Sequence, residues 1–164
     1  MRNVFITLFV SLSFASVGQA DKLKTNYHLV NVGYDQIGQH GFPKVGYSFV
    51  YNRWDKDIMP YNFHVISADL GFGSVNNKFT FAPGLTYNFY GLFYFAGLNA
   101  TYFTSEKGND LRIAPQVGLS WMGLINVGYT YYLAADDKNQ LKTLKNNGLI
   151  LSVRIPLSSG FFGY

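Results

Sequence analysis

The sequence contains no cysteine, only 5 prolines and little charge. Without cysteine the chain can have neither a disulfide framework nor thiolate chemistry. Charged residues make up 13% of the chain, roughly half of the ~25% that is usual for globular proteins. Because a water-soluble domain normally covers its surface with charge, this composition disfavours an ordinary soluble domain.

The little charge that is present is spread along the chain. The net charge is +4, and basic residues stand next to acidic ones, as in residues 53–57. A nucleic-acid-binding surface needs clustered Lys and Arg. We therefore expect no nucleic-acid partner.

Aromatic residues and glycine are abundant instead, with 13 Tyr, 15 Phe and 17 Gly among the 164 residues. Tyr and Phe favour strands, and Gly permits turns and close backbone approaches. The length suits one domain. The composition favours a single all-β domain.

The first twenty residues have the three-part layout of a secretory signal peptide. Arg2 gives the basic start, residues 4–14 are mostly apolar, and Gly18 and Ala20 place small residues before the predicted cleavage site. The apolar stretch is too short to cross a membrane comfortably as a helix. We assign residues 1–20 to a signal peptide and residues 21–164 to the mature chain.

The mature chain shows the period-two alternation of strands. In the segment 111–122, for example, Leu111 and Ile113 share one face, while Arg112 and Gln116 share the other. The facing of the first and third strands stays open, because neither of their faces is clearly polar. We predict eight strands, each long enough to cross a bilayer at a tilt: 25–34, 44–52, 61–70, 78–89, 92–103, 111–122, 124–135 and 147–157.

The residues on the two faces of these strands indicate whether water or lipid surrounds the barrel. The polar face is mostly Gly, Ser, Thr, Asn and Gln, and only Asp69, Arg112 and Arg154 place charge well inside a strand. A soluble barrel would need a charged outer wall, whereas a membrane barrel turns large apolar residues to lipid and packs small polar ones inside. We therefore expect residues 21–164 to form an outer-membrane β-barrel domain, an antiparallel up-and-down transmembrane β-barrel of about eight strands.

The connections are expected to alternate between long external loops and short periplasmic turns, as in outer-membrane barrels. Very short turns are predicted near Gly91 and Gly123. The topology requires a third turn on the same side at 53–60, but this segment is longer than a minimal turn, so its assignment stays open. The long external loops are predicted at 35–43, 71–77, 104–110 and 136–146.

Aromatic residues near strand ends suit the girdles that such barrels place at the two membrane interfaces. The predicted girdle residues are Tyr27, Tyr51, Trp54, Tyr61, Phe89, Tyr90, Phe103 and Trp121.

Arg112 and Arg154 face the interior in this arrangement, and a buried charge needs a partner. Asp69 is the candidate within a strand, with Glu106 and Asp110 as alternatives. A ligand site in the lumen is the other possibility; a wide channel is not expected, because side chains fill an eight-stranded barrel. The predicted polar network of the lumen consists of Asp69, Asn99, Arg112, Gln116, Ser120, Thr130 and Arg154.

With these features, residues 25–164 resemble the small outer-membrane β-barrels of the OmpA/OmpX type. Members of that group tend to end on an aromatic residue that their assembly machinery reads, and residues 160–164 are similar. The resemblance implies the outer membrane of a Gram-negative bacterium as location. It also implies outer-membrane lipid and the outer-membrane assembly machinery as partners.

The three histidines raise the possibility of lipid A modification, which some eight-stranded outer-membrane barrels perform with His, Ser and an acid. His64 and Ser67 are three residues apart, so they point to opposite faces of a regular strand. His28 and His40 have no Ser or acid at a suitable spacing. No metal-ligand cluster, phosphate-binding Gly loop or nucleotide motif is recognisable, so we predict neither catalytic residues nor a cofactor.

These sequence features are compatible with three functions. The preferred one is a non-enzymatic outer-membrane barrel with a structural or surface-interaction role, whose external loops contact an unknown extracellular partner. An outer-membrane lipid A-modifying enzyme is the first alternative. A soluble periplasmic barrel that binds an apolar ligand is the second.

Overall fold

The computed structural model describes residues 24–53, 62–106, 108–135 and 141–157. These residues form antiparallel strands joined by turns. The strands are β1 (Lys24–Ile37), β2 (His40–Arg53), β3 (Phe63–Val75), β4 (Lys78–Tyr90), β5 (Tyr94–Ser105), β6 (Gly108–Trp121), β7 (Ile125–Tyr131), β8 (Leu133–Ala134) and β9 (Asn147–Pro156).

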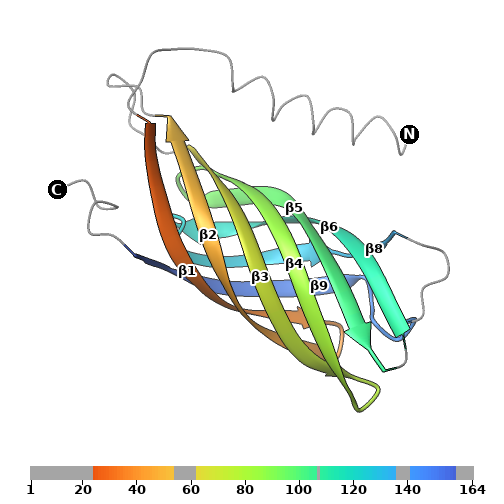
Figure 1. Cartoon of the computed structure of the whole chain (residues 1–164). Helices are drawn as coiled ribbons and strands as arrows, with labels where there is room; N and C mark the ends of the chain where they lie inside the picture. Colours follow the sequence, from red (N-terminus) through yellow and green to blue (C-terminus); the bar gives the residue numbers. More distant parts are fainter. Residues whose placement is uncertain (1–23, 54–61, 107, 136–140, 158–164) are drawn as a thin grey trace.

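The strands close into a barrel. The sheet runs in the order β5-β4-β3-β2-β1-β9-β7-β6, and β6 also pairs with β5. The two-residue strand β8 follows β7 and pairs with β6 as well. Figure 1 shows the strands winding obliquely around one axis, with β9 beside β1. The prediction of an all-β, eight-stranded antiparallel barrel is confirmed.

The barrel has two different ends, which we name by their connections. The terminal end is where β1 begins and β9 ends; the hairpin end carries the β1–β2, β3–β4 and β5–β6 turns. The β1–β2 and β3–β4 turns are only two residues long, at 38–39 and 76–77, and β6 begins at Gly108, shortly after β5 ends at Ser105.

Three of the four predicted external loops, 35–43, 71–77 and 104–110, are therefore wrong, because the strands continue through them. Several polar and glycine residues of these segments, such as Asp35, Gly73 and Asp110, are inward-facing strand positions. A Cβ on Gly73, for instance, would lie 2.6 Å from the ring of Phe42, so glycine here makes room for a lumen side chain. Asn76 and Asn77 then reverse the chain with φ of 53° and 62°, as a tight hairpin requires.

The structure also settles the facing of the first and third strands. Leu29 and Asn31 of β1 are buried in the barrel, and so are Val65 and Ser67 of β3. Odd-numbered residues of both strands thus point inward. The inward positions of these two strands carry polar residues (Asn, Ser, Asp) in some places and Leu or Val in others. For this reason neither face looked clearly polar in the sequence.

Three predicted girdle residues face the interior instead. Tyr90 and Phe103 are buried, and Tyr27 packs against an apolar cluster inside the terminal end. Residues two positions away on the same strand also point inward. The alternation along the strand therefore places these three aromatic residues inside the barrel, although aromatic rings prefer the membrane interface. Phe89 and Trp121, one residue out of phase with the inward positions, lie on the outer wall.

Some predictions fall outside the described residues. These are the signal peptide at 1–20, the terminal aromatic segment at 160–164, nearly all of the turn at 53–60 and the girdle residues Trp54 and Tyr61.

The outer wall is almost wholly apolar. Exposed fractions reach 72% for Leu119, 63% for Leu85 and 61% for Leu149. Polar residues fill the interior while large hydrophobic residues face out, which is the inverse of a soluble barrel.

Candidate functional site: the barrel lumen

The lumen consists of three layers stacked along the barrel axis. An apolar cluster closes each end, and polar side chains fill the space between. The buried polar and charged residues are Asn31, Asp35, Ser48, Ser67, Thr80, Thr86, Asn88, Asn99, Thr101, Asp110, Arg112, Gln116, Ser120, Asn126, Thr130 and Arg154.

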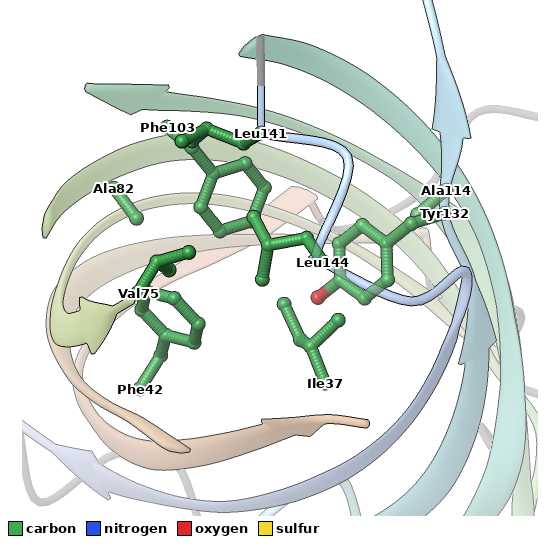
Figure 2. Close-up of a cluster of buried hydrophobic side chains, with 9 residues drawn as sticks. All are labelled: Ile37, Phe42, Val75, Ala82, Phe103, Ala114, Tyr132, Leu141 and Leu144. Atoms are coloured by element: carbon green, nitrogen blue, oxygen red, sulfur yellow. The ribbon is translucent and has the colours of Figure 1, made fainter. Parts of the chain in front are cut away.

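Residues 141–146, which precede β9, fold back into the hairpin end and plug it. Leu141 and Leu144 are only 1% and 3% exposed. Figure 2 shows both side chains among Phe42, Phe103 and Tyr132 in the barrel mouth. We call residues 141–146 the plug. The fourth predicted external loop, 136–146, is thus longer than a hairpin turn, but Leu141 and Leu144 in its described part are buried in the barrel.

Arg112 holds the plug in place. Its side chain is fully buried, with its Nε donating to Asp110 Oδ2 at 2.8 Å. Nη1 donates to the carbonyls of Leu144 and Lys145 at 3.0 and 3.1 Å, and Nη2 donates to the carbonyl of Leu141 at 3.3 Å. The guanidinium thus satisfies three carbonyl groups that a turn buried in the lumen leaves without strand partners.

A second charged group spans β1 and β2. Lys44 Nζ lies 2.7 Å from Asp35 Oδ2, which also accepts a 2.8 Å hydrogen bond from the Tyr132 hydroxyl. Tyr132 packs in the hairpin-end cluster, so this bond joins the apolar end to the polar middle. A buried ion pair needs such extra hydrogen bonds to offset its desolvation.

The polar middle is a mesh of short side chains. Asn31 donates to Asp69 at 3.0 Å and accepts from Ser48 at 2.7 Å, and Ser48 lies 2.6 Å from the hydroxyl of Ser67. Asp69 is flanked on both neighbouring strands by glycine, Gly46 on β2 and Gly84 on β4. A Cβ on Gly46 would collide with Asp69 Oδ1 and the Ala68 carbonyl, so glycine is required beside this carboxylate.

Arg154 occupies the other side of the mesh. Its Nη1 donates to the hydroxyl of Tyr90 and, at 3.1 Å, to the carbonyl of Gly123. Its guanidinium carbon lies 4.9 Å from the centroid of the Tyr90 ring, within the range of a cation–π contact. The charge of Arg154 is therefore held by a phenol ring, a hydroxyl and a backbone carbonyl.

A small cavity remains in the middle of the lumen. It measures about 40 Å³ and is lined by Lys44, Asp69 and Arg154 together with several amides. Arg154 Nε has no protein partner. One water needs about 10–15 Å³ of such space, whereas sites for small molecules take about 300–1,000 Å³. This cavity therefore has room for a few waters but not for an organic ligand.

The seven predicted network residues are distributed over this lumen. Asn99 donates to Thr86 at 2.7 Å, and Gln116 donates to Asn88 at 2.6 Å. Ser120 donates to Asn126 at 2.8 Å, and Thr130 donates to the Pro115 carbonyl at 3.4 Å. The remaining three are Asp69, Arg112 and Arg154, which are described above.

Asp69 is not the partner of Arg112, contrary to the preferred prediction. Arg112 pairs with Asp110, two residues earlier on the same strand, and Asp69 is bonded to Asn31. Glu106, the other alternative, forms an exposed ion pair with Lys78 at 2.7 Å. Arg112 instead bonds a carboxylate on the inner face of its own strand.

Sequence reasoning missed the Asp35–Lys44 pair and Tyr132. Asp35 lay in a predicted loop, and the facing of the first strand was undecided. The alternation of Asn31, Gly33 and Asp35 with Val32 and Tyr34 was the signal that could have extended β1 to the turn.

The histidines lie outside the lumen. His64 faces outward, with its Nδ1 2.7 Å from the hydroxyl of Tyr87; Ser67 points inward and is buried. The two are on opposite faces, as their spacing predicted. His28 bonds the hydroxyl of Tyr47 on the outer wall, and His40 bonds the Ser74 carbonyl at 3.0 Å near the hairpin end.

Within the described ranges, no three His, Cys, Asp or Glu residues lie close enough to hold a metal ion. The same residues contain no helix that is long and apolar enough to cross a membrane. No protein-family model matches the chain, and no curated protein matches it either. Its function is therefore inferred from the barrel itself.

Proposed function

We propose that the chain is an integral outer-membrane β-barrel of a Gram-negative bacterium with a structural role and a closed lumen. The observation that carries this proposal is the inverted distribution of side chains, with a polar interior inside an apolar outer wall. In water, that wall would be an exposed hydrophobic surface far larger than soluble monomers carry. In a bilayer it is the favourable surface.

The order of residues along the outer wall supports a membrane position. On β4, Phe79 and Phe81 lie toward the hairpin end, Tyr87 and Phe89 toward the terminal end, and Leu85 between them. Phe79 and Phe89 are ten residues apart, which corresponds to about 33 Å along a strand and about 25 Å at a tilt of roughly 40°. An apolar band of about 25 Å between aromatic girdles is typical of outer-membrane barrels.

The lumen supports a structural role rather than a conducting one. Apolar clusters close both ends and the central cavity holds only about 40 Å³. Among the described connections at the hairpin end, the β1–β2 and β3–β4 turns are two residues long, and Leu141 and Leu144 of the plug are buried in the barrel. The larger interaction surface is the outer wall, whose partner in this proposal is lipid. Insertion by the outer-membrane assembly machinery belongs to the same proposal.

A substitution to arginine on the outer wall distinguishes a membrane barrel from a soluble one. Leu98 lies on the outer face of β5, midway between Tyr94 and Tyr102. In a bilayer, Leu98→Arg should cost about 2–4 kcal/mol of unfolding free energy, as arginine does near the midplane. In water, the same exposed substitution should stay within about 0.5 kcal/mol.

The measurement is urea unfolding of the barrel refolded into phosphatidylcholine vesicles. The matched control is Ser74→Arg, at an exposed position at the end of β3, for which a cost of about 0–1 kcal/mol is expected near the interface. Equal stability of Leu98→Arg and the parent protein, or a parent protein that stays folded in solution without lipid or detergent, would contradict the proposed membrane position.

A further inference from the structure

Arg154 is a buried cation that touches no carboxylate among the described residues. It is 6% exposed, and its Nε has no protein partner. The described ion pairs use Lys44, Lys78 and Arg112 as their cations. The Nη1 of Arg154 bonds a hydroxyl and a backbone carbonyl, which supply no opposite charge. Because a buried charge without an opposite charge is costly, the counter-charge of Arg154 has to be found elsewhere in the lumen.

Asp69 is the matching case, a carboxylate without a cation in direct contact. Its Oδ1 accepts a 3.0 Å hydrogen bond from the neutral amide of Asn31. The two fully buried carboxylates, Asp35 and Asp110, have cations of their own. In the described lumen one cation and one carboxylate are therefore left over, and both line the same cavity of about 40 Å³.

The strand register places the two charges in one row across the barrel wall. Arg154 of β9 is the neighbour of Asn31 of β1, and Asn31 is followed in the row by Gly46 of β2 and Asp69 of β3. Three strand spacings separate the backbones of Arg154 and Asp69, a distance of about 14 Å along the wall. A Cβ on Gly46 would collide with Asp69 Oδ1, so the carboxylate lies over Gly46. It thus leans from β3 toward the strand that neighbours Arg154.

The cavity between these charges has the size and the polar groups that water requires. Its volume of about 40 Å³ holds roughly three waters, each of which needs two to four polar partners. Arg154 Nε is one donor. Asn31 and Asn88 each use one of their two amide N–H groups in the described side-chain contacts, which leaves a second N–H on each. Asp69 supplies the acceptor, because a carboxylate only accepts.

The presence of both donors and a carboxylate distinguishes water from an inorganic anion. Water can accept from Arg154 and donate to Asp69 at the same time, whereas an anion only accepts and would be repelled by the carboxylate. Of the small occupants that fit the cavity, water therefore matches the whole lining.

We propose that the centre of the lumen is a buried-water site that joins Arg154 to Asp69 as a water-mediated ion pair. Water accepts from Arg154 Nε and donates to the Asp69 carboxylate, so Asp69 is the counter-charge of Arg154 although the two side chains do not touch. The site is a function of the interior alone and does not depend on the membrane position proposed above.

A double-mutant cycle tests whether the two charges are coupled. Arg154→Met and Asp69→Asn are compared singly and together by urea unfolding of the full barrel in phosphatidylcholine vesicles. Each single variant leaves one buried charge without its counterpart and should raise the unfolding equilibrium constant about tenfold or more. In the Asp69→Asn background, Arg154→Met should have an effect about tenfold smaller than in the parent protein. The lost contacts of Arg154 Nη1 are the same in both backgrounds and cancel.

The matched control cycle combines Asp69→Asn with Lys78→Met. Lys78 carries the same charge as Arg154, but it is exposed and pairs with Glu106 near the hairpin end. The effects of these two substitutions should multiply to within about twofold, as they do for distant sites. Heat-modifiable gel mobility establishes that each variant is folded. A cycle of Arg154 and Asp69 that is as additive as the control overturns the proposal.

A crystal structure of the parent barrel gives a second test that needs no variant. Ordered water should lie within about 3.2 Å of Arg154 Nε and connect it through hydrogen bonds to Asp69. A dry cavity or a direct contact between the two side chains overturns the proposal. Bromide in the cavity after a bromide soak, detected by its anomalous scattering, overturns it as well, because the counter-charge of Arg154 would then be an anion from solution.

Discussion

Removing the Arg112 side chain should release the plug. Arg112 connects the β6 strand to the plug through the carbonyls of Leu141, Leu144 and Lys145. In Arg112→Ala the Leu144 carbonyl and the Asp110 carboxylate remain buried without this donor, while the Leu141 carbonyl keeps the amide of Leu144. The barrel wall itself keeps all of its backbone pairing at this position, so the change acts on the plug and the buried charge.

The size of the effect follows from the burial of the pair. Arg112 and Asp110 side chains are 0% and 2% exposed. Breaking a buried ion pair by removing one partner costs about 3–5 kcal/mol, because an uncompensated charge remains. Since about 1.4 kcal/mol corresponds to a factor of ten, the unfolding equilibrium constant should rise by about 100- to 4,000-fold. The losses from the carbonyl groups overlap with this figure and are not added to it.

The assay is equilibrium urea unfolding in phosphatidylcholine vesicles, combined with limited proteolysis of the folded barrel. Arg112→Ala should lose about 3–5 kcal/mol and become sensitive to cleavage in the plug. The matched control is Lys78→Ala, which removes an ion pair of the same kind, 2.7 Å to Glu106, whose side chains are 46% and 71% exposed. Exposed pairs contribute about 0–1 kcal/mol.

A loss of less than about 1 kcal/mol in Arg112→Ala, within the range of an exposed pair, would contradict the role assigned to this arginine. It would mean that water reaches Asp110 and the plug carbonyls in the folded barrel. Arg112→Lys separates charge from geometry, because lysine keeps the charge but cannot contact all of these oxygens in one fork. We expect it to restore only part of the stability.

Two further predictions concern the middle of the lumen. Lys44→Met should cost about 3–5 kcal/mol in the same unfolding assay, because the buried Asp35 carboxylate loses its cation, and a cost equal to that of Lys78→Met would contradict a buried pair. Gly46→Ala should cost more than Gly84→Ala: a Cβ on Gly46 collides with Asp69 and backbone, whereas one on Gly84 comes no closer than 3.1 Å to its neighbours. Overpacking of this kind costs about 1–3 kcal/mol, and equal losses for the two glycines would show that Asp69 moves aside freely.

Much of the fold could be predicted from the sequence because the alternation of side chains is a local property. In β6, Arg112 and Gln116 occur in phase with each other and out of phase with Leu111 and Ile113, so their placement on the inner and outer faces follows from the strand alone. The low charge and the inverted faces then select a barrel with an apolar outer wall. The same alternation predicted that His64 and Ser67 lie on opposite faces of their strand.

Where each inward side chain finds its partner depended on the tertiary structure. Period two assigns a residue to a face, but the register and the neighbouring strands decide what lies opposite. Asp69 therefore contacts Asn31 rather than an arginine, and Asp35 meets Lys44 across a hairpin that was expected to be a loop.

The contacts at the two ends of the barrel could not be predicted from the alternation along single strands either. Tyr90 and Phe103 were assigned to membrane girdles by residue type, yet they pack inside because closed barrel ends need bulky side chains. The plug has no periodicity to read, and its position depends on the distant guanidinium of Arg112. The strands, their faces and the apolar wall follow from the sequence alone, because they are set by neighbours along the chain. The ion pairs, the plug and the central cavity follow only from the folded chain, because they depend on which strands meet around the closed barrel.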